Sequence, residues 1–285
     1  RCGWPCGDNH APLAGPLMLD LLQFTNDPLL ARRCDALEGL RLVVDLERLG
    51  KAERQAGRNT FISAHTLEDV GRIKSELRRA RLMVRVNPLY EGTPGEVDDA
   101  IAQGADLLML PMFTDATTLR EFARIVDGRR PIVPLVETAD ALRSAHEWID
   151  TPDLWEVFVG LNDLHISMGL RFMFEPLAMG ALETVSMLAL ARGLRFGFGG
   201  IARLDEGLLP GRAVLGEHLR LGSQAVILSR TFNRPDAGSS YEDGIRALRQ
   251  AERELAARDP AHVQADAHDT ADRIRQIANG MAAAR

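Results

Sequence analysis

The sequence predicts a (β/α)8 TIM barrel with extra C-terminal helices. Short aliphatic runs alternate with stretches whose apolar residues recur every three or four positions, as parallel strands alternate with covering helices. Eight such units within 285 residues favour a closed barrel over an open sheet. We therefore expect one domain over residues 1–285, with the barrel at about 17–232 and a C-terminal helical arm at about 241–285.

The expected elements follow one another along the whole chain. The strands are expected at residues 17–24, 40–46, 81–87, 106–111, 131–137, 156–160, 195–201 and 224–229. Apolar spacing predicts helices over 67–77, 96–103, 116–126, 139–148, 182–191 and 211–221, with terminal helices over 241–257 and 270–281. Residues 233–240 have the composition of a loop.

Composition and charge argue against several classes of partner. The formal net charge is −6, and no basic stripe is interleaved with aromatic residues, so we expect no nucleic-acid partner. The longest apolar runs, such as Leu107 to Met112, are too short to cross a bilayer, so we expect no membrane partner. No charged-then-apolar leader opens the sequence, which leads us to expect a cytoplasmic protein.

The three cysteines favour a reducing compartment. Cys2, Cys6 and Cys34 are odd in number, which does not suit a disulfide scaffold. Cys2 and Cys6 resemble half of a metal-binding knuckle, but no second pair follows them. We expect both to be free thiols, and the sequence assigns them no role.

Polar residues end several of the apolar runs, at the places where the active site of such a barrel is built. They are Asp45 and Glu47, Arg85 and Asn87, Glu137, and Asn162 and Asp163. A glutamate closing one strand and an arginine within another are not turn formers, and each is costly to bury without a partner. These residues therefore predict a functional site at the carboxyl ends of the strands.

Carboxylates that face one another at a barrel mouth repel unless a proton or a cation lies between them. A hard divalent ion such as Mg²⁺ or Mn²⁺ suits such a place, because it takes oxygen ligands and leaves positions for water and substrate. For Glu137 considered alone, a salt bridge to Arg85 across the barrel is an equally good interpretation.

Five short motifs in a fixed order carry a resemblance to a known family. They are Val43-Val-Asp-Leu-Glu47, Val84-Arg-Val-Asn-Pro88, Gly104-Ala-Asp-Leu-Leu-Met-Leu-Pro111, Pro134-Leu-Val-Glu-Thr138 and Val159-Gly-Leu-Asn-Asp-Leu164. Together they resemble the HpcH/HpaI aldolase and citrate lyase beta-subunit family of the phosphoenolpyruvate/pyruvate barrel superfamily. The resemblance covers roughly residues 17–232.

The resemblance implies roles for particular residues. Glu137 and Asp163 match the two ligands of a divalent metal. Arg85 matches the arginine that contacts the keto or enolate oxygen of the substrate. The turn that holds the substrate carboxylate through backbone N–H groups matches Gly160, Leu161 and Asn162. Metal and arginine together would stabilise the charge of an enolate.

The general base is left open. In the aldolase branch a histidine follows the acidic pair of the second strand, and Arg48 stands at that place here. His165 is one candidate, although it also fits a helix-start residue that faces solvent or caps a turn. Glu47 and Asp45 are the others, and each could instead act on the metal through water.

Four further features have two readings each. His65 precedes an expected helix start, and only a long connection could bring it to the mouth. The aromatic stretch 171–175 could shape a pocket but better fits a packed loop. The glycine-rich run 197–201 could hold a phosphate, although it lacks a nucleotide fingerprint. Arg203 could contact an anionic substrate tail or lie in solvent.

These observations lead to one main functional prediction and two alternatives. The main prediction is a metal-dependent carbon–carbon lyase or class II type aldolase that acts through a pyruvate-type enolate. It would use a 2-oxo acid similar to pyruvate or oxaloacetate, with an aldehyde or acyl acceptor. The alternatives are an acyl-CoA lyase of the malyl-, citramalyl- or citryl-CoA type and a non-catalytic barrel that binds metal and keto acid. The terminal helices and the resemblance lead us to expect a homo-oligomer.

Overall fold

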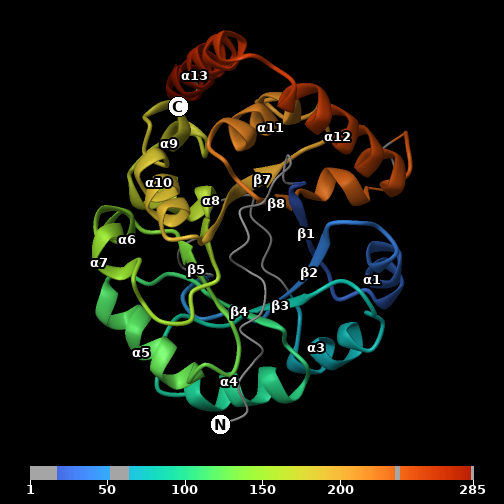
Figure 1. The fold of residues 1–285 in the computed structure, drawn as a ribbon, viewed down its shortest axis with the longest axis vertical. Coiled ribbons are helices and arrows are strands. Elements are labelled where there is room, and N and C mark those ends of the chain that lie inside the picture. Colours follow the sequence, from blue (N-terminus) through green and yellow to red (C-terminus); the bar gives the residue numbers. More distant parts are fainter. Residues whose placement is uncertain (1–17, 52–63, 235–237, 284–285) are drawn as a thin grey trace.

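The computed structural model describes residues 18–51, 64–234 and 238–283. Within them, eight parallel strands pair in chain order and close into a barrel surrounded by helices (Figure 1), which confirms the predicted fold. The strands are β1 (Asp20–Phe24), β2 (Leu40–Asp45), β3 (Leu82–Arg85), β4 (Leu107–Leu110), β5 (Ile132–Val136), β6 (Glu156–Val159), β7 (Arg195–Ile201) and β8 (Ala225–Leu228).

The helices lie mostly where apolar spacing predicts them. Around the barrel are α1 (Pro28–Asp35), α3 (Leu67–Lys74), α4 (Thr93–Ala102), α5 (Ala116–Val126), α6 (Ala139–Arg143), α7 (Ala145–Trp148), α8 (Leu161–Ser167), α9 (Glu175–Ala178), α10 (Glu183–Ala191) and α11 (Gly211–Arg220). The 3₁₀ helix η1 (Arg230–Asn233), α12 (Tyr241–Ala256) and α13 (Pro260–Ala283) follow β8. None of the helices in the described ranges has the length and apolarity needed to cross a membrane.

Helices α1, α8 and α9 lie outside the predicted ranges, and two of the predicted helices differ for local reasons. The expected helix 139–148 divides at Ser144, whose hydroxyl donates to the carbonyl of Asp140 at 2.9 Å and so competes with the helical bonds. The last helix begins at Pro260, ten residues earlier than predicted. There Asp259 accepts a hydrogen bond from the His262 backbone N–H, and a proline suits the first helical turn.

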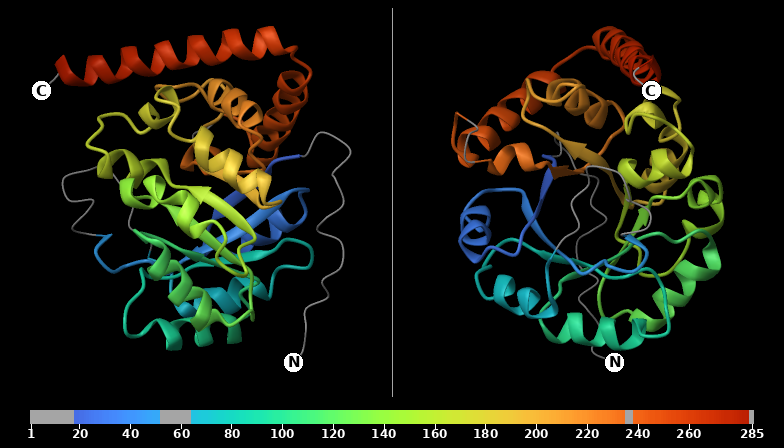
Figure 2. Two further views of the ribbon diagram at one scale, coloured as in Figure 1. Left: turned by 60° about the vertical axis from the view of Figure 1, so that its left-hand side comes forward. Right: turned by 180° about the vertical axis from the view of Figure 1, so that it is seen from behind.

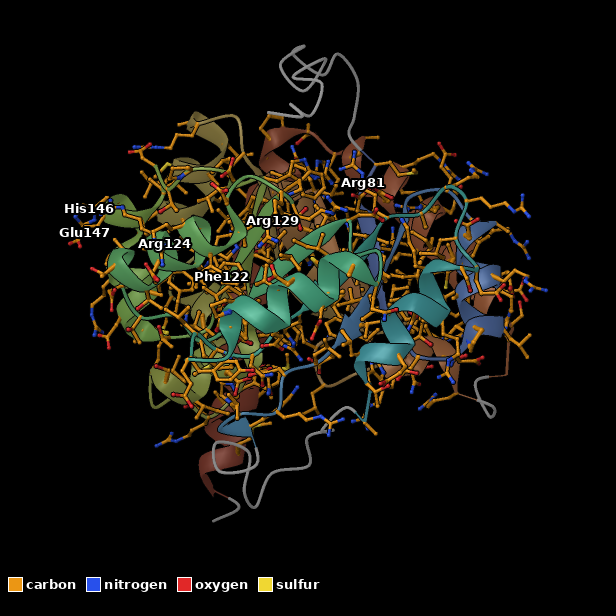
Figure 3. All side chains as sticks on the ribbon, turned by 90° about the horizontal axis from the view of Figure 1, so that it is seen from below. Arg81, Phe122, Arg124, Arg129, His146 and Glu147 are labelled. Carbon is orange, nitrogen blue, oxygen red and sulfur yellow. The ribbon has the colours of Figure 1, made fainter. Side chains whose placement is uncertain are left out.

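Apolar side chains form an inner and an outer core. Inside the barrel lie Leu22, Val43, Met83, Leu107, Met109, Val133, Leu135, Phe158 and Ala225. The larger outer core lies between strands and helices. In α5, for example, Phe122 is fully buried while the side chain of Arg124 is 72% exposed (Figure 3). The interior of the barrel is therefore packed with apolar side chains.

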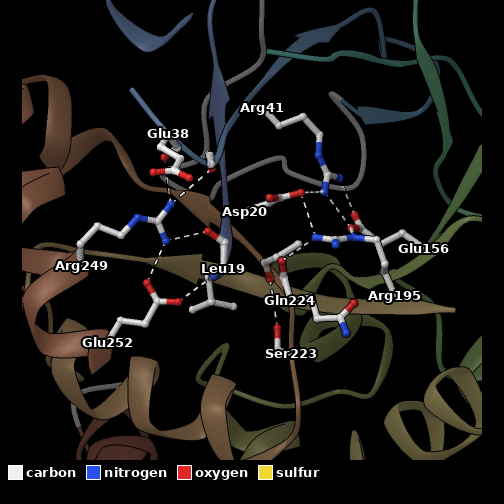
Figure 4. Close-up of polar contacts among 12 residues, drawn as sticks. Leu19, Asp20, Glu38, Arg41, Glu156, Arg195, Ser223, Gln224, Arg249 and Glu252 are labelled. Atoms are coloured by element: carbon white, nitrogen blue, oxygen red, sulfur yellow. Dashed lines mark hydrogen bonds and ion pairs between the residues drawn. The ribbon is translucent and has the colours of Figure 1, made fainter. Parts of the chain in front are cut away.

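An ion cluster closes the amino end of the barrel (Figure 4). Arg41 binds both carboxylate oxygens of Glu156, at 2.7 and 2.9 Å, and Asp20 at 2.6 Å. Arg195 contacts Asp20 at 2.8 Å and Glu156 at 3.2 Å. Both guanidinium groups lie about 5 Å from the ring centre of Trp155. In a barrel of this type such an end serves stability rather than chemistry.

The C-terminal helices cover one side of the barrel (Figure 2). Helix α12 packs on α11, and α13 lies along α9 and α11 of the same chain. The side chains that α13 buries are spaced four residues apart, at Thr270, Ile274 and Ala278. The predicted C-terminal helical arm thus has a buried face, and in this structure that face packs against helices of its own chain.

Candidate active site

The predicted site residues follow the carboxyl ends of four strands. Asp45 ends β2, Arg85 ends β3, Glu137 follows β5, and Asp163 lies in the first turn of α8 after β6. Because the strands of a closed parallel barrel all point the same way, these four side chains belong to the same mouth. The three carboxylates are each at most 8% exposed.

The main partner of Arg85 is Asp45. The Nε and Nη2 atoms of Arg85 donate to the two oxygens of Asp45 at 2.8 and 2.7 Å, in a planar bidentate pair. The Nη1 atom lies 4.0 Å from Oε1 of Glu137. The salt bridge between Arg85 and Glu137 is therefore long, at 4.0 Å, and the guanidinium is oriented mainly by Asp45 of β2.

Charge pairing controls the ionisation of this pair. Burial disfavours the charge of Asp45, but Arg85 and Lys51 outweigh it and hold the pKa of Asp45 well below its usual range. Burial likewise opposes the charge of Arg85, whereas Asp45, Glu47 and Glu137 raise its pKa. Asp45 is thus a carboxylate, and its low proton affinity suits it to orienting Arg85 rather than to accepting a proton.

Lys51 is a site residue that sequence reasoning missed. Its Nζ atom lies 2.8 Å from Oδ2 of Asp45 and 3.4 Å from Oε2 of Glu47, and the residue is 3% exposed. Two signals in the sequence could have identified it. It follows Glu47 by four positions, and it is one of only two lysines in a chain with 34 basic residues.

Glu137 fits closely against the turn after β6. A Cβ atom added to Gly160 would lie 2.7 Å from both Cγ and Oε1 of Glu137, so only glycine leaves room for this side chain. The N–H group of Gly160 donates to the carbonyl of Val136 at 3.0 Å and extends the pairing of β5 with β6. It is not available for a substrate carboxylate, which corrects the role expected for Gly160.

The remaining part of the expected carboxylate site is the start of α8. Leu161 and Asn162 are its first two residues, and N–H groups in a first helical turn have no partner within the helix. Asp163 follows them directly and is 8% exposed. The helix therefore places two amides next to one of the two predicted metal ligands.

The two histidines near the mouth differ in the nitrogen that carries hydrogen. The Nδ1 atom of His165 lies 3.2 Å from the carbonyl oxygen of Leu161, so Nδ1 is the donor and Nε2 has the lone pair. The Nδ1 atom of His65 accepts the backbone N–H of Asp45 at 3.0 Å, so its hydrogen lies on Nε2. Burial lowers the pKa of His65. From the sequence, only a long connection was expected to bring His65 to the mouth. In the structure His65 lies at the end of β2.

Arg48, which stands where a histidine was expected, forms hydrogen bonds with His65 and Asn87. Its guanidinium donates to the carbonyl of His65 at 2.9 Å, and its backbone N–H donates to Oδ1 of Asn87 at 2.8 Å. Asn87 in turn donates to Glu96 at 2.8 Å. Asn87 and Arg48 therefore connect the turn after β2 to its neighbours.

Arg203 and the aromatic stretch 171–175 make structural contacts. Arg203 donates to the carbonyls of Thr231 and Phe232, at 2.9 and 3.1 Å, and so holds the connection after β8 instead of facing solvent. In the aromatic stretch, Phe172 and Phe174 are both nearly buried and pack edge to face. Cys34 is a buried thiol, while Cys2 and Cys6 lie outside the described residues.

A metal at this mouth would have few protein ligands. In the described ranges, no three residues among histidine, cysteine, aspartate and glutamate gather closely enough to hold an ion. A pair of carboxylates from successive strands is nevertheless enough for Mg²⁺, which usually keeps water or substrate oxygens in its other positions. The donor set of Glu137 and Asp163 is consistent with such an ion.

Comparisons with known proteins agree with this fold. Residues 24–194 match the family model for HpcH/HpaI aldolase/citrate lyase. No curated protein sequence matches the chain. A solved HpcH/HpaI aldolase/citrate lyase family protein from Burkholderia cenocepacia is similar in fold, with 18% identity, 86% of this chain and 96% of that chain covered, and a TM-score of 0.58.

A second similar structure is the citrate lyase beta subunit of M. tuberculosis in complex with oxaloacetate and magnesium. It is 19% identical, the match covers 83% of this chain and 97% of that chain, and the TM-score is 0.56. At these identities the two structures support the fold, and the family model extends the likeness to the stretch that carries Asp45, Arg85, Glu137 and Asp163.

Proposed function

Because this chain belongs to the HpcH/HpaI aldolase/citrate lyase family, we propose that it is a divalent-metal-dependent carbon–carbon lyase of the aldolase type. It acts on a 2-oxo acid through a pyruvate-type enolate. The observation that carries the proposal is the approach of Arg85 to Glu137, 4.0 Å apart at the mouth, with Arg85 held in place by Asp45. This arrangement puts a fixed positive group beside a proposed metal ligand, so that Arg85 and the ion could both meet the negative charge of an enolate oxygen.

Glu137 and Asp163 are the residues that would hold Mg²⁺ or Mn²⁺. Both offer buried oxygen atoms, and the bare backbone of Gly160 makes the space that Glu137 occupies. The ion would polarise the keto group and add positive charge where the enolate forms. The similar citrate lyase beta subunit was solved with magnesium and oxaloacetate, which supports a metal and a keto acid here.

The protein residues then have separate tasks. Arg85 donates from Nη1 to the keto oxygen, whose negative charge grows as the bond between the carbons α and β to the keto group breaks and its electron pair forms the enolate. The amides of Leu161 and Asn162 hold the substrate carboxylate, as N–H groups at helix starts hold anions. Asp45 keeps the guanidinium in its plane through two hydrogen bonds.

For proton transfer we favour His165 among the predicted candidates. Its Nε2 atom has the lone pair that a base needs, because Nδ1 is bound to Leu161. Asp45 is ion-paired and its pKa is lowered, so it is a weak base. Glu47 lies 3.4 Å from both Lys51 and Arg85, and we assign it to the same charge cluster.

The test follows the exchange of the methyl protons of pyruvate with solvent, which requires enolate formation. The wild-type protein should catalyse this exchange with Mg²⁺ and stop when the metal is chelated. Glu137→Ala should abolish the exchange, whereas Glu217→Ala, which removes a buried carboxylate of α11, should keep it. Unchanged exchange in Glu137→Ala would refute the proposal, and a wild-type protein that binds metal and pyruvate without exchange would favour the non-catalytic alternative.

A second candidate is an acyl-CoA lyase, which breaks a carbon–carbon bond of an acyl-CoA substrate and leaves its thioester intact. It is supported by a similar structure, the protein CitE of Mycobacterium tuberculosis in complex with magnesium, acetoacetate and coenzyme A, which is 19% identical with a TM-score of 0.54. The same metal and arginine would serve both reactions. Binding of acetyl-CoA distinguishes them, because the aldolase needs no site for the nucleotide.

A further inference from the structure

Lys51 is unusual both in its environment and in this chain. It is one of two lysines among the 34 lysine and arginine residues of the chain. Its side chain is 4% exposed, and burial of an ammonium group is costly unless it is well paired. A compact ammonium at the mouth therefore needs an explanation that the family resemblance did not supply.

Lys51 completes a ring of four alternating charges. Oδ2 of Asp45 accepts from both Lys51, at 2.8 Å, and Arg85, at 2.7 Å. Oε2 of Glu47 lies 3.4 Å from Lys51 and 3.4 Å from Nε of Arg85. Each carboxylate thus faces both cations, and the four side chains together carry no net charge.

This balance determines what Arg85 can offer to a ligand. Nε and Nη2 of Arg85 face Asp45 and Glu47, while Nη1 is turned towards Glu137. Without Lys51, the two acids after β2 would have one cation fewer and would draw the guanidinium more strongly to their side. The positive potential at Nη1 would fall, and the plane of the guanidinium would lose one of its restraints.

We propose that Lys51 is a positioning residue for the enolate chemistry, which sets the charge and orientation of Arg85 through Asp45 and Glu47. The inference rests on the proposed function. It assigns Lys51 no contact with substrate, because its Nζ atom is occupied by two carboxylates. Its effect is exerted on the transition state, where Arg85 meets the developing negative charge, more than on the bound substrate.

The test compares Lys51→Met, Lys51→Arg and the control Lys74→Met. Lys74 also forms a close ion pair, with Asp106 at 2.6 Å, but at the amino end of β4. Steady-state kinetics should show that Lys51→Met lowers kcat by about 10- to 100-fold with a small change in KM. Lys51→Arg, which keeps the charge, should recover most of kcat, and Lys74→Met should match the wild type.

Binding separates failure of this inference from failure of the proposed function. Calorimetry with oxalate and Mg²⁺ should give similar affinities for the wild type and Lys51→Met. If the wild type neither binds oxalate with Mg²⁺ nor turns over a 2-oxo acid, the proposed function fails and the inference with it. If the wild type is active and Lys51→Met equals Lys74→Met, or Lys51→Arg is as slow as Lys51→Met, the inference alone is overturned. If Lys51→Met does not fold, Lys51→Arg becomes the deciding variant. A kcat close to that of the wild type supports the inference, and a kcat lower by about 10-fold or more overturns it.

Discussion

Arg85 binds Asp45 through one edge of its guanidinium and turns Nη1 towards Glu137, a proposed metal ligand. Bidentate binding of a carboxylate fixes the plane of the group, and a lysine could not do the same with its single nitrogen. Asp45 and Lys51 lie on the same side of it. The direction of the positive charge at this mouth is therefore decided by residues that follow a neighbouring strand.

At the same scale, Gly160 is required by its contact with Glu137. Gly160→Ala would put a methyl group 2.7 Å from Cγ and Oε1 of Glu137, so the carboxylate must move. Misplacement by about 1 Å costs roughly 100-fold in rate, and we expect at least that loss in metal-dependent exchange of pyruvate protons.

The matched control for that change is Gly95→Ala in α4. A Cβ atom at Gly95 meets nothing within 4 Å, and alanine is the better helix former by about 0.5–1 kcal/mol. This variant should keep full exchange and unfold at slightly higher denaturant concentration. Full activity in Gly160→Ala would contradict the packing described for Glu137.

At the scale of elements, the contact of α11 with β7 contains a buried imidazole. His218 of α11 is fully buried and stacks on Phe198 of β7, with ring centres 3.7 Å apart. Its Nδ1 atom lies 2.8 Å from the Ser223 hydroxyl, and its Nε2 atom has no hydrogen-bond partner. Burial lowers the pKa of His218 to about 3. The neutral ring is thus part of the packing that holds α11 on the barrel.

This contact predicts a loss of stability in acid. An unfolded histidine takes up a proton below its pKa of about 6.5, while folded His218 stays neutral down to about pH 3. The free energy of unfolding should therefore fall by roughly 1.4 kcal/mol per pH unit between these values. His218→Phe should lack this contribution, and His262→Phe, at an exposed histidine of α13, should keep it. Urea unfolding between pH 7 and pH 4 measures the difference, and equal slopes in all three proteins would count against it.

At the scale of the whole molecule, the barrel separates its two ends by role. The amino end is closed by the pairing of Arg41 with Glu156, while the carboxyl end holds Asp45, Arg85 and Glu137. A metal that binds only the folded barrel would stabilise all of it, because Glu137 and Asp163, the proposed ligands, follow different strands.

This linkage gives a prediction for thermal unfolding. Mg²⁺ at about 100 times its dissociation constant adds about 2.7 kcal/mol, which corresponds to a rise in Tm of roughly 4–5 °C for a protein of this size. The rise should disappear in Glu137→Ala and persist in Glu217→Ala, and chelation should reverse it. A rise of equal size in Glu137→Ala would place the ion elsewhere.

The sequence alone determined the barrel, because near-continuous aliphatic strands and amphipathic helices have different periods that neighbouring residues reveal. It also determined that Asp45, Arg85, Glu137 and Asp163 lie at or just after the carboxyl ends of strands, since polar residues interrupt apolar runs there. Only the tertiary structure decided their partners. Strand register and the packing of loops in three dimensions decide that Asp45 rather than Glu137 binds Arg85. They also bring Lys51 and His65 to the same mouth. The N–H group of Gly160 is engaged in a hydrogen bond for the same reason. Spacing along a chain records the period of each element, but it does not record the distances between side chains of different elements.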